Sequence, residues 1–362
     1  MHPALKPFVF ERGGHTVRNR TVLAAMTNKQ SHPDGTLSED EIQWLEARSE
    51  GGFGIITTAA THVEKDGQGW EGEFGTWSDT HLEGLTQLAQ NINLHGGIGL
   101  AQLFHGGMRA PERLTGCQPK SASENELGSG LGQSRAMTAE DIEGTIRAFG
   151  LAANRCEKAG FQGVELHGAH GYLIAQFLGA STNRRNDEWG GSQKKRTRFL
   201  REIVNNVRRC TSPNFLVGVR LSPVLASCGL DLDDALDTLQ QCNEMDLDFV
   251  HVSCWDITET CIYNGKEEPY TTHFRNVLDE AIPLITTGGV WNANDAHLAH
   301  RQGAAFVGVG RVAIAHPDWP RYLSGNAKEP KRPPFDEAWL VKAKLNPTFI
   351  DYMRRWDGFV SD

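Results

Sequence analysis

The segment LVGVRLSP at residues 216–223 decides the fold class, because its pattern recurs along the chain. In an extended strand, Val217, Val219 and Leu221 share one face, and Arg220 lies on the opposite face. A short run that is apolar at nearly every position is typical of a parallel strand covered on both sides. Seven other runs have this character: 21–26, 54–61, 97–105, 163–170, 248–254, 283–290 and 306–311.

Segments with helix-like spacing separate these eight runs. Ser38 precedes one of them and Glu41 follows three positions later, as in a capping box. Asp79 and Thr138 likewise come directly before two other helical segments. The remaining helical segments are 192–210, 231–245, 272–281 and 293–302. Eight strands alternating with helices predict an α/β protein with a closed (β/α)8 TIM barrel. The alternative is an open doubly wound sheet, but the GxGxxG turn typical of that fold is missing.

We expect a single domain over 1–362, with the barrel core at about 18–325 and a C-terminal extension at 326–362 that wraps the outside. Two long segments interrupt the alternation after the third and sixth strands, at 106–137 and 255–271. Loops of this length in a compact domain are commonly functional. We therefore expect both to act as lids over the site.

Composition excludes several classes of protein. With 36 Lys and Arg against 45 Asp and Glu, the formal charge is −9, which argues against a nucleic-acid partner. No apolar run approaches the length of a membrane span, and the N-terminus lacks a signal-peptide core. Seven scattered cysteines without a CxxC pair fit reduced thiols. The sequence thus predicts a cytoplasmic protein with neither a membrane partner nor a metal site.

Reactive side chains cluster at the predicted strand ends, where a barrel carries its active site. They are Met26, Thr27, Gln102, His105, His167, His170, Arg220 and Arg311. Arg220 is expected to point to the barrel mouth, where it needs an accepting partner to offset its desolvation. A plain ion pair with Glu165 is the alternative.

Glycines mark the last two strand ends, as Gly288-Gly289 and Gly310-Arg311. Barrels often bind phosphate after strands seven and eight, where glycine lets backbone N–H groups approach the oxygens. Arg311 would add a charge. The alternative is that the glycines only form tight turns.

The segment His167-Gly168-Ala169-His170-Gly171-Tyr172 carries the densest group of reactive side chains. Two neutral histidines are suited to donate hydrogen bonds to a substrate oxygen that becomes negative, and Tyr172 can deliver a proton. Zinc is disfavoured, because no carboxylate or cysteine ligand stands close by. A satisfied core histidine is the simpler reading of either ring alone.

Residues 165–191, ELHGAHGYLIAQFLGASTNRRNDEWGG, resemble the signature of the old yellow enzyme family of FMN-dependent oxidoreductases. The resemblance runs from about residue 5 to residue 325. It includes RNRTVLAAMT at 18–27, GTWSD at 75–79 and VGVGR at the eighth strand. The family's fold is a (β/α)8 barrel, in agreement with the strand count.

The resemblance implies a role for each candidate residue. Thr27 would bond the flavin C4 carbonyl, and Arg220 would lie against the N1 and C2 side of the ring. The full implied FMN set is Ala25, Met26, Thr27, Ala59, Gln102, Arg220, Gly288, Gly289, Gly310 and Arg311, the last three with the phosphate. His167 and His170 would bind the substrate carbonyl oxygen, and Tyr172 would be the proton donor.

The resemblance also implies the reaction. NAD(P)H would reduce FMN, and the activated C=C bond of an α,β-unsaturated carbonyl compound would receive a hydride from flavin N5 and a proton from Tyr172. The alternative is the same scaffold acting on quinones, nitro compounds or nitrate esters. A Schiff-base lyase is disfavoured because no predicted strand ends in Lys, and a non-catalytic FMN-binding barrel because His167, His170 and Tyr172 are intact. The implied partners are a small enone-type substrate, a nicotinamide cofactor and a second copy of the chain.

Three positions depart from the family's pattern. Several relatives have Cys at the place of Thr27, and some have Tyr at the place of Lys29. Arg354-Arg355-Trp356 could reach a neighbouring subunit's site, as in some oligomeric relatives, but a solvated tail is the favoured interpretation.

Overall fold

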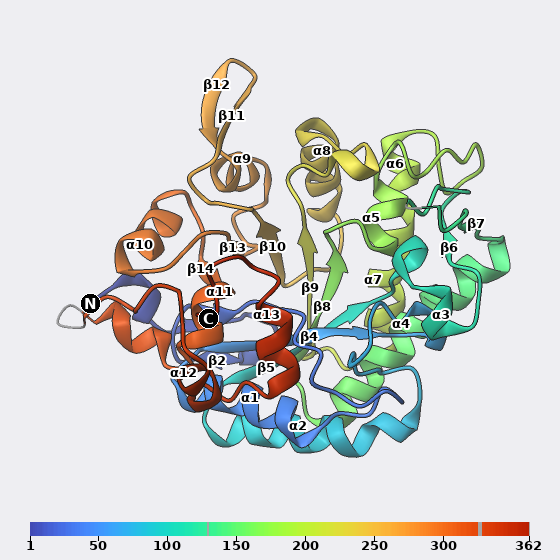
Figure 1. The fold of residues 1–362 in the computed structure, drawn as a ribbon. Helices are drawn as coiled ribbons and strands as arrows, with labels where there is room; N and C mark the ends of the chain where they lie inside the picture. The colour runs from blue at the N-terminus through green and yellow to red at the C-terminus, as the bar shows by residue number, and fades with distance from the viewer. Residues whose placement is uncertain (129, 325–327, 362) are drawn as a thin grey trace.

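A closed ring of eight parallel strands forms the centre of the computed structural model, which describes residues 1–128, 130–324 and 328–361 (Figure 1). The ring closes by pairing of the last strand with the first. Its members, each within a few residues of one predicted run, are β3 (Thr21–Leu23), β4 (Ile55–His62), β5 (Ile98–Phe104), β8 (Gly163–Gly168), β9 (Leu216–Leu221), β10 (Phe249–Ser253), β13 (Leu284–Thr287) and β14 (Phe306–Val309). The predicted (β/α)8 barrel is confirmed.

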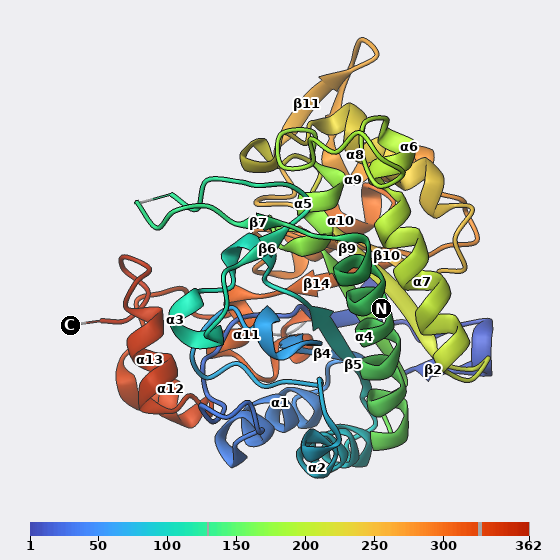
Figure 2. The same cartoon turned by 90° about the vertical axis from the view of Figure 1, so that its right-hand side faces the viewer.

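Helices cover the outside of the ring (Figure 2). The Ser38 hydroxyl accepts the Glu41 N–H at 3.1 Å, as predicted, but the Glu41 carboxylate does not return to the cap and instead accepts from Asn28 and Ser31. Thr138 and Asp141 form a complete capping box. The longer helices are α1 (Glu39–Glu50), α2 (Leu82–Leu94), α4 (Ala139–Ala159), α7 (Arg198–Cys210), α8 (Leu232–Cys242), α9 (Tyr270–Val277) and α10 (Ala293–Arg301); the shorter ones are α3 (Glu112–Thr115), α5 (Leu173–Leu178), α6 (Gln193–Arg196), α11 (Arg311–Ala315), α12 (Glu337–Lys342) and α13 (Pro347–Met353).

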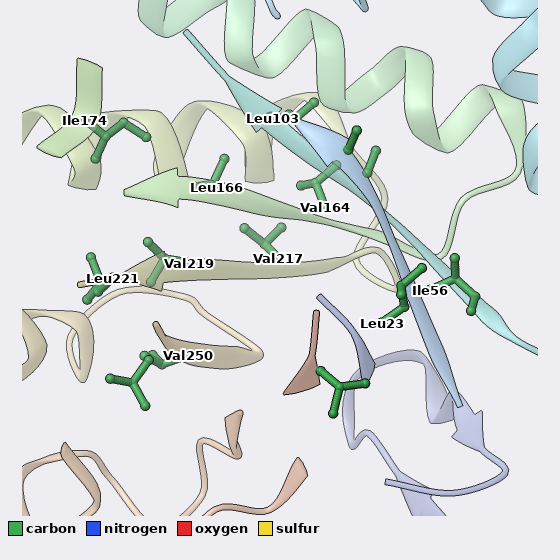
Figure 3. Packing of buried hydrophobic residues seen from close by; sticks show 14 of the residues in the cluster. Leu23, Ile56, Leu103, Val164, Leu166, Ile174, Val217, Val219, Leu221 and Val250 are labelled. Atoms are coloured by element: carbon green, nitrogen blue, oxygen red, sulfur yellow. The ribbon is translucent and has the colours of Figure 1, made fainter. Parts of the chain in front are cut away.

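Two apolar layers follow from strand alternation. Val217, Val219 and Leu221 face outward and pack with the helices, as predicted (Figure 3). A smaller cluster, which includes Leu216 and Phe249, fills the inside of the ring. The hairpin of β1 (Phe8–Val9) and β2 (Thr16–Val17) adds further apolar side chains to this inner cluster. The inner layer therefore leaves the other end of the barrel for polar side chains.

The two expected lid loops carry structure of their own. Residues 106–137, of which 129 lies outside the described residues, hold α3, β6 (Lys120–Ser121) and β7 (Arg135–Ala136). In 255–271, the expected loop is replaced by a projecting hairpin of β11 (Thr260–Tyr263) and β12 (Lys266–Pro269) (Figure 1). Asn264 and Gly265 turn it with φ of 50° and 76°. Asn-Gly is the preferred pair for a two-residue hairpin turn, a signal that the sequence contained.

The C-terminal segment packs on the outside of the barrel, as expected, over the part of 326–362 that the structure describes. Phe335, Leu340 and Phe349 are fully buried. The buried Arg48 guanidinium donates to the carbonyl oxygens of Ala313, Ile314 and Ala343, and so joins α1 to this segment. No helix among the described residues combines the length and apolar character of a membrane span.

Candidate functional site

Arg220 lies buried at the barrel mouth, with 5% of its surface exposed. Its Nη1 donates to the Ala25 carbonyl oxygen at 3.1 Å and its Nη2 to the Ser253 hydroxyl at 3.0 Å. The alternative of an ion pair with Glu165 is wrong, because Glu165 instead contacts Gln102 and His251. Burial lowers the pKa of Arg220 and the charge of Glu165 opposes this.

Ala59 lies at an irregularity in the ring, next to Ala60, which pairs with Gln102. The register of β4 against β5 shifts between Thr57 and Ala60, which places Ala59 in a β-bulge. The Gln102 amide donates to Glu165 at 2.7 Å. Burial raises the pKa of Glu165, but His251, Arg220 and Gln102 outweigh this and hold it below its ordinary value. The carboxylate is therefore ionised and fixes the orientation of the Gln102 side chain.

The backbone conformation favours glycine at the first of the two predicted phosphate turns. Gly289 has φ of 67°, and a Cβ there would lie 2.7 Å from Asp256 Oδ2. A Cβ at Gly310 would lie 3.1 Å from Met26 Sδ, so the ends of β14 and β3 meet at this point. The positive φ explains Gly289 as a turn residue, and the phosphate role of both glycines stays a prediction. Arg311 is exposed and lies over the Trp255 ring.

His167, His170 and Tyr172 converge beside Arg220. The two imidazole rings are 5.0 Å apart and edge-on, and the ring of Tyr172 lies 4.9 Å from that of His167. Burial first, then neighbouring charges that include Arg220, lower the pKa of both histidines well below 6.5, so both are neutral. Burial also raises the pKa of Tyr172, which keeps its phenol protonated.

The hydrogen bonds assign the donor nitrogens. His167 Nδ1 accepts the Ala169 N–H at 3.3 Å, so its Nε2 carries the proton and is a donor. The Ser253 hydroxyl accepts from Arg220 and lies 2.8 Å from His170 Nε2. When this hydroxyl donates to Nε2, His170 Nδ1 is left as an N–H. The pair can therefore present two donors to a ligand oxygen.

Comparison with known proteins places this site in a family. Residues 5–329 match the model of the NADH:flavin oxidoreductase / NADH oxidase family. This chain belongs to that family. A probable NADH-dependent flavin oxidoreductase of Bacillus subtilis is 35% identical over 326 residues, which cover 88% of this chain and 86% of the relative.

Solved structures agree with this assignment. The old yellow enzyme homologue from Zymomonas mobilis aligns with a TM-score of 0.79 at 26% identity, over 96% of this chain and 99% of that one. Morphinone reductase in complex with tetrahydroNAD aligns with a TM-score of 0.80 at 26% identity, over 96% of both chains. The chain spans only 35% and 32% of two longer relatives, an NADH:fumarate oxidoreductase of Klebsiella pneumoniae and an NADH:acrylate oxidoreductase of Vibrio harveyi. The predicted family, FMN cofactor and NAD(P)H reductant are confirmed.

The residues of this flavin oxidoreductase fit its cofactor. Arg220 Nε is buried and has no hydrogen-bond partner among the described residues, although a buried N–H ordinarily has one. An accepting ligand beside Arg220 would satisfy this donor, as the edge of a flavin ring would. Ala25, Met26 and Thr27 are half-buried and line the same mouth, whereas the next residue, Asn28, is buried.

Several residues of the flavin oxidoreductase's site escaped the sequence reasoning. Ser253 joins Arg220 to His170, and Trp70 lies 6.3 Å from Tyr172, ring centre to ring centre. The guanidinium of Arg109, in the loop after β5, lies 4.6 Å from the centre of the Tyr172 ring. Strand alternation places Ser253 at the site only when the pairing of β9 with β10 is also known. No local sequence signal marks Trp70 or Arg109 as site residues.

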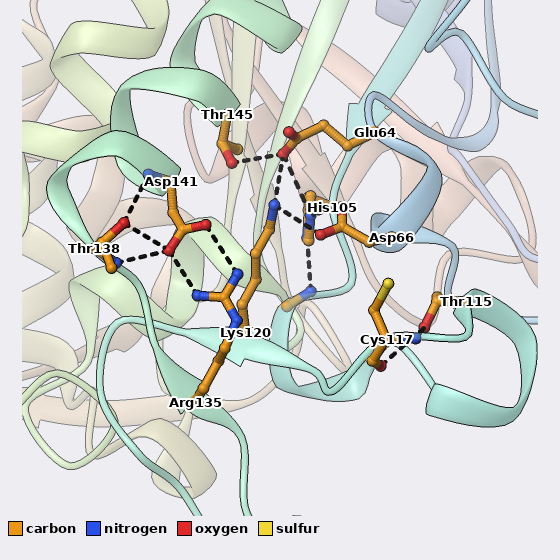
Figure 4. Close-up of polar contacts among 11 residues, drawn as sticks. Glu64, Asp66, His105, Thr115, Cys117, Lys120, Arg135, Thr138, Asp141 and Thr145 are labelled. Atoms are coloured by element: carbon orange, nitrogen blue, oxygen red, sulfur yellow. Dashed lines mark hydrogen bonds and ion pairs between the residues drawn. The ribbon is translucent and has the colours of Figure 1, made fainter.

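His105 does not join the group of His167, His170 and Tyr172. It lies on the outer side of the strand end, where its Nε2 contacts Asp66 at 3.3 Å (Figure 4). The Lys120 ammonium lies 3.1 Å from Glu64 Oε2 and 3.0 Å from Asp66 Oδ2. Glu64, Asp66 and His105 are close enough together to hold a metal ion, but the Lys120 ammonium already neutralises the two carboxylates. This network anchors the base of the 106–137 segment to the loop after β4. The expectation that the protein has no metal site stays a prediction.

Lys120→Met is expected to lower the free energy of unfolding by roughly 1–3 kcal/mol, because it leaves two partly buried carboxylates without their cation. Burial raises the pKa of Asp66, but His105 and Lys120 outweigh this and lower it below its ordinary value. The ion pair thus stabilises the fold above the carboxyl's unfolded pKa of about 3.9 and is lost as pH falls below it. The deficit of the variant, measured by thermal unfolding, should therefore shrink in acid. The exposed neighbour Lys65→Met is the control, and equal melting points for the two variants would refute the anchor.

Proposed function

We propose that this flavin oxidoreductase reduces the activated C=C bond of small α,β-unsaturated carbonyl compounds with NAD(P)H. The observation that carries the proposal is the juxtaposition of two neutral histidines and a protonated tyrosine, all within ring contact at one strand end. Such a group suits a substrate that gains negative charge on an oxygen and a proton on a nearby carbon. A cytoplasmic location and a homo-oligomeric state stay predictions.

The chain's own residues divide this work. His167 and His170 bind the carbonyl oxygen through their N–H groups and orient the substrate. Burial keeps the two rings neutral, so each donates a hydrogen bond without holding a positive charge. Tyr172 holds the proton that the carbon receives. No described residue makes a hydrogen bond to the Tyr172 hydroxyl, which leaves it available to a ligand.

Arg220, Gln102 and the Ala25–Thr27 segment would hold the cofactor. FMN, when bound, accepts hydride from NAD(P)H and supplies it to the substrate. Arg220 would place a fixed positive charge against the ring, and Ser253 ties that same arginine to His170. Cofactor and substrate subsites therefore share one hydrogen-bonded chain.

The first test concerns the cofactor. Arg220→Met is expected to weaken FMN retention by roughly 10- to 100-fold, since a charge-assisted hydrogen bond contributes about 1.5–3 kcal/mol. The measurement is the dissociation constant from flavin fluorescence on titration of the apoprotein. The exposed Arg209→Met, which is remote from the strand ends, is the control. Unchanged affinity for FMN would place Arg220 outside the cofactor site.

The second test concerns the substrate. The yellow holoenzyme is assayed anaerobically with NADH and NADPH against a cyclic enone, a quinone and a nitro compound. Faster turnover of the enone, with hydrogen added across its C=C bond in the product, supports the proposal. Turnover confined to the quinone or the nitro compound would refute it.

A further inference from the structure

Two tyrosines at the mouth of the site each carry cationic side chains on their rings. The guanidinium of Arg109 lies 4.6 Å from the centre of the Tyr172 ring. The ammonium of Lys29 lies 5.0 Å, and the guanidinium of Arg355 5.3 Å, from the centre of the Tyr352 ring. Three cations that come from the end of β3, the loop after β5 and the C-terminal segment thus gather around two phenols.

The two tyrosines belong to one site. Lys29, which lies on the Tyr352 ring, packs its backbone against Gly72, because a Cβ at Gly72 would overlap the Lys29 carbonyl oxygen. Two residues before Gly72, Trp70 lies 6.3 Å from Tyr172, ring centre to ring centre. Both tyrosine side chains are half-buried, as is Lys29, so each has one side in contact with the protein and one side open. The Lys29–Tyr352 pair therefore stands on the approach to the proton donor.

The backbone of Lys29 has a strained conformation. Its φ of 59° lies in the left-handed region, which a residue with a side chain adopts only under constraint. On either side, Asn28 is bonded to the Glu41 carboxylate, and Gln30 Oε1 accepts the Asn346 N–H at 3.1 Å. Since Asn346 caps α13, the helix that carries Tyr352, one network positions both members of the pair.

None of the three cations forms an ion pair within residues 1–128, 130–324 and 328–361. Nearby arginines do: Arg113 pairs with Glu71 at 2.7 Å, and Arg354 with Glu337. The whole chain carries a net charge of −9, so its average field repels anions. Lys29, Arg109 and Arg355, which have no ion-pair partner among the described residues, therefore form a local positive charge at the mouth of a negatively charged protein.

We propose that Lys29, Arg109 and Arg355 form a cation rim that recognises a negatively charged carboxylate or phosphate group on the molecule entering the site. This inference rests on the proposed function, because it assigns the ligand class of the same site. The anionic group belongs either to the unsaturated substrate or to the nicotinamide nucleotide, since both enter through this mouth. A single charge recognised in this position accounts for about a tenfold change in affinity.

A matched pair of phenols tests the rim on the oxidised holoenzyme. 4-Hydroxybenzoate and 4-hydroxybenzamide share the oxygen that the histidines bind and differ in one charge. Lys29→Gln and Arg355→Gln are each expected to weaken 4-hydroxybenzoate about tenfold by calorimetric titration, and 4-hydroxybenzamide by less than about twofold. Arg109→Gln also removes the bond that Arg109 donates to the His170 carbonyl oxygen, so it should weaken both phenols, and the benzoate about tenfold more than the benzamide. Added salt should weaken the benzoate alone.

Two control variants lie outside the site. Lys344 is exposed and has φ of 70°, so Lys344→Gln repeats the change at another left-handed lysine. Arg113→Gln removes a charge from the Arg109 segment that already has a partner. Both should leave the two titrations unchanged. Equal losses for the benzoate and the benzamide would overturn the rim. So would unchanged binding of both phenols together with an unchanged rate of flavin reduction by NADH.

The source of the anion is read from the reduction of the bound flavin. NADH is compared with the uncharged N-benzyl-1,4-dihydronicotinamide as reductant. If the variants lose only the rate of flavin reduction by NADH, the rim binds the nucleotide. If they lose only affinity for 4-hydroxybenzoate, the rim binds the substrate. Either result supports the inference. If the wild type binds neither phenol, the proposed function fails, and equal reduction rates of the variants with NADH would then overturn the rim separately.

Discussion

Tyr172→Phe is expected to slow reduction of a cyclic enone by about 10²- to 10⁴-fold, the range that a positioned general acid contributes. The phenol lies within ring contact of both His167 and Phe104, and burial keeps it protonated at neutral pH. Phenylalanine preserves these aromatic contacts and removes only the hydroxyl. The loss should therefore be chemical and not structural.

The two half-reactions separate this role from others. Reduction of the bound flavin by NAD(P)H needs no proton from Tyr172, so stopped-flow measurement should find that rate unchanged within about twofold. Re-oxidation by the enone carries the whole loss. An equal loss in both half-reactions would remove Tyr172 from the role of proton donor. Tyr352→Phe keeps the ring beneath Lys29 and serves as the matched control.

His167→Ala and His170→Ala are each expected to slow the enone half-reaction by about 10²- to 10³-fold, which is the usual cost of one oxyanion donor. The same variants should weaken 4-hydroxybenzamide binding, because the phenol oxygen occupies the place of the carbonyl. Flavin reduction by NADH is the internal control. Unaltered phenol affinity in both variants would return the histidines to a purely structural role.

His170 also permits a conservative comparison. Its φ of 59° suits asparagine better than other residues with side chains, and the asparagine amide is again a donor. His170→Asn should therefore lose less activity than His170→Ala. Since the pKa of both histidines lies well below 6.5, binding of 4-hydroxybenzamide should stay level from neutral pH down through 6.5. A step centred near 6.5 would contradict neutral, buried rings.

The sequence was sufficient for the barrel because the ring repeats one local pattern eight times. Alternation in 216–221 placed Val217 outward and Arg220 inward, and both are found there. The HGAHGY segment likewise put three reactive groups on one short stretch, and no long-range contact was needed to find them.

Contacts between distant segments could not be predicted. Ser253 reaches His170 only through the pairing of neighbouring strands, and Tyr352 reaches Lys29 across almost the whole chain. His105 was wrongly predicted to lie at the site. It comes three residues after Gln102, so its side chain lies on the opposite face of the strand, where it contacts Asp66. The hairpin at 260–269 was missed for a different reason, since its Asn-Gly turn was present in the sequence.

The pairing of β14 with β3 has a consequence for synthesis on the ribosome. Until Val309 has emerged, β3 and β13 each present a row of unpaired backbone N–H and C=O groups. Such edges are templates for aggregation, and contacts between the two ends of a chain form slowly. Chaperone supply and translation rate should therefore govern the yield of this enzyme in expression hosts more strongly than its final stability does.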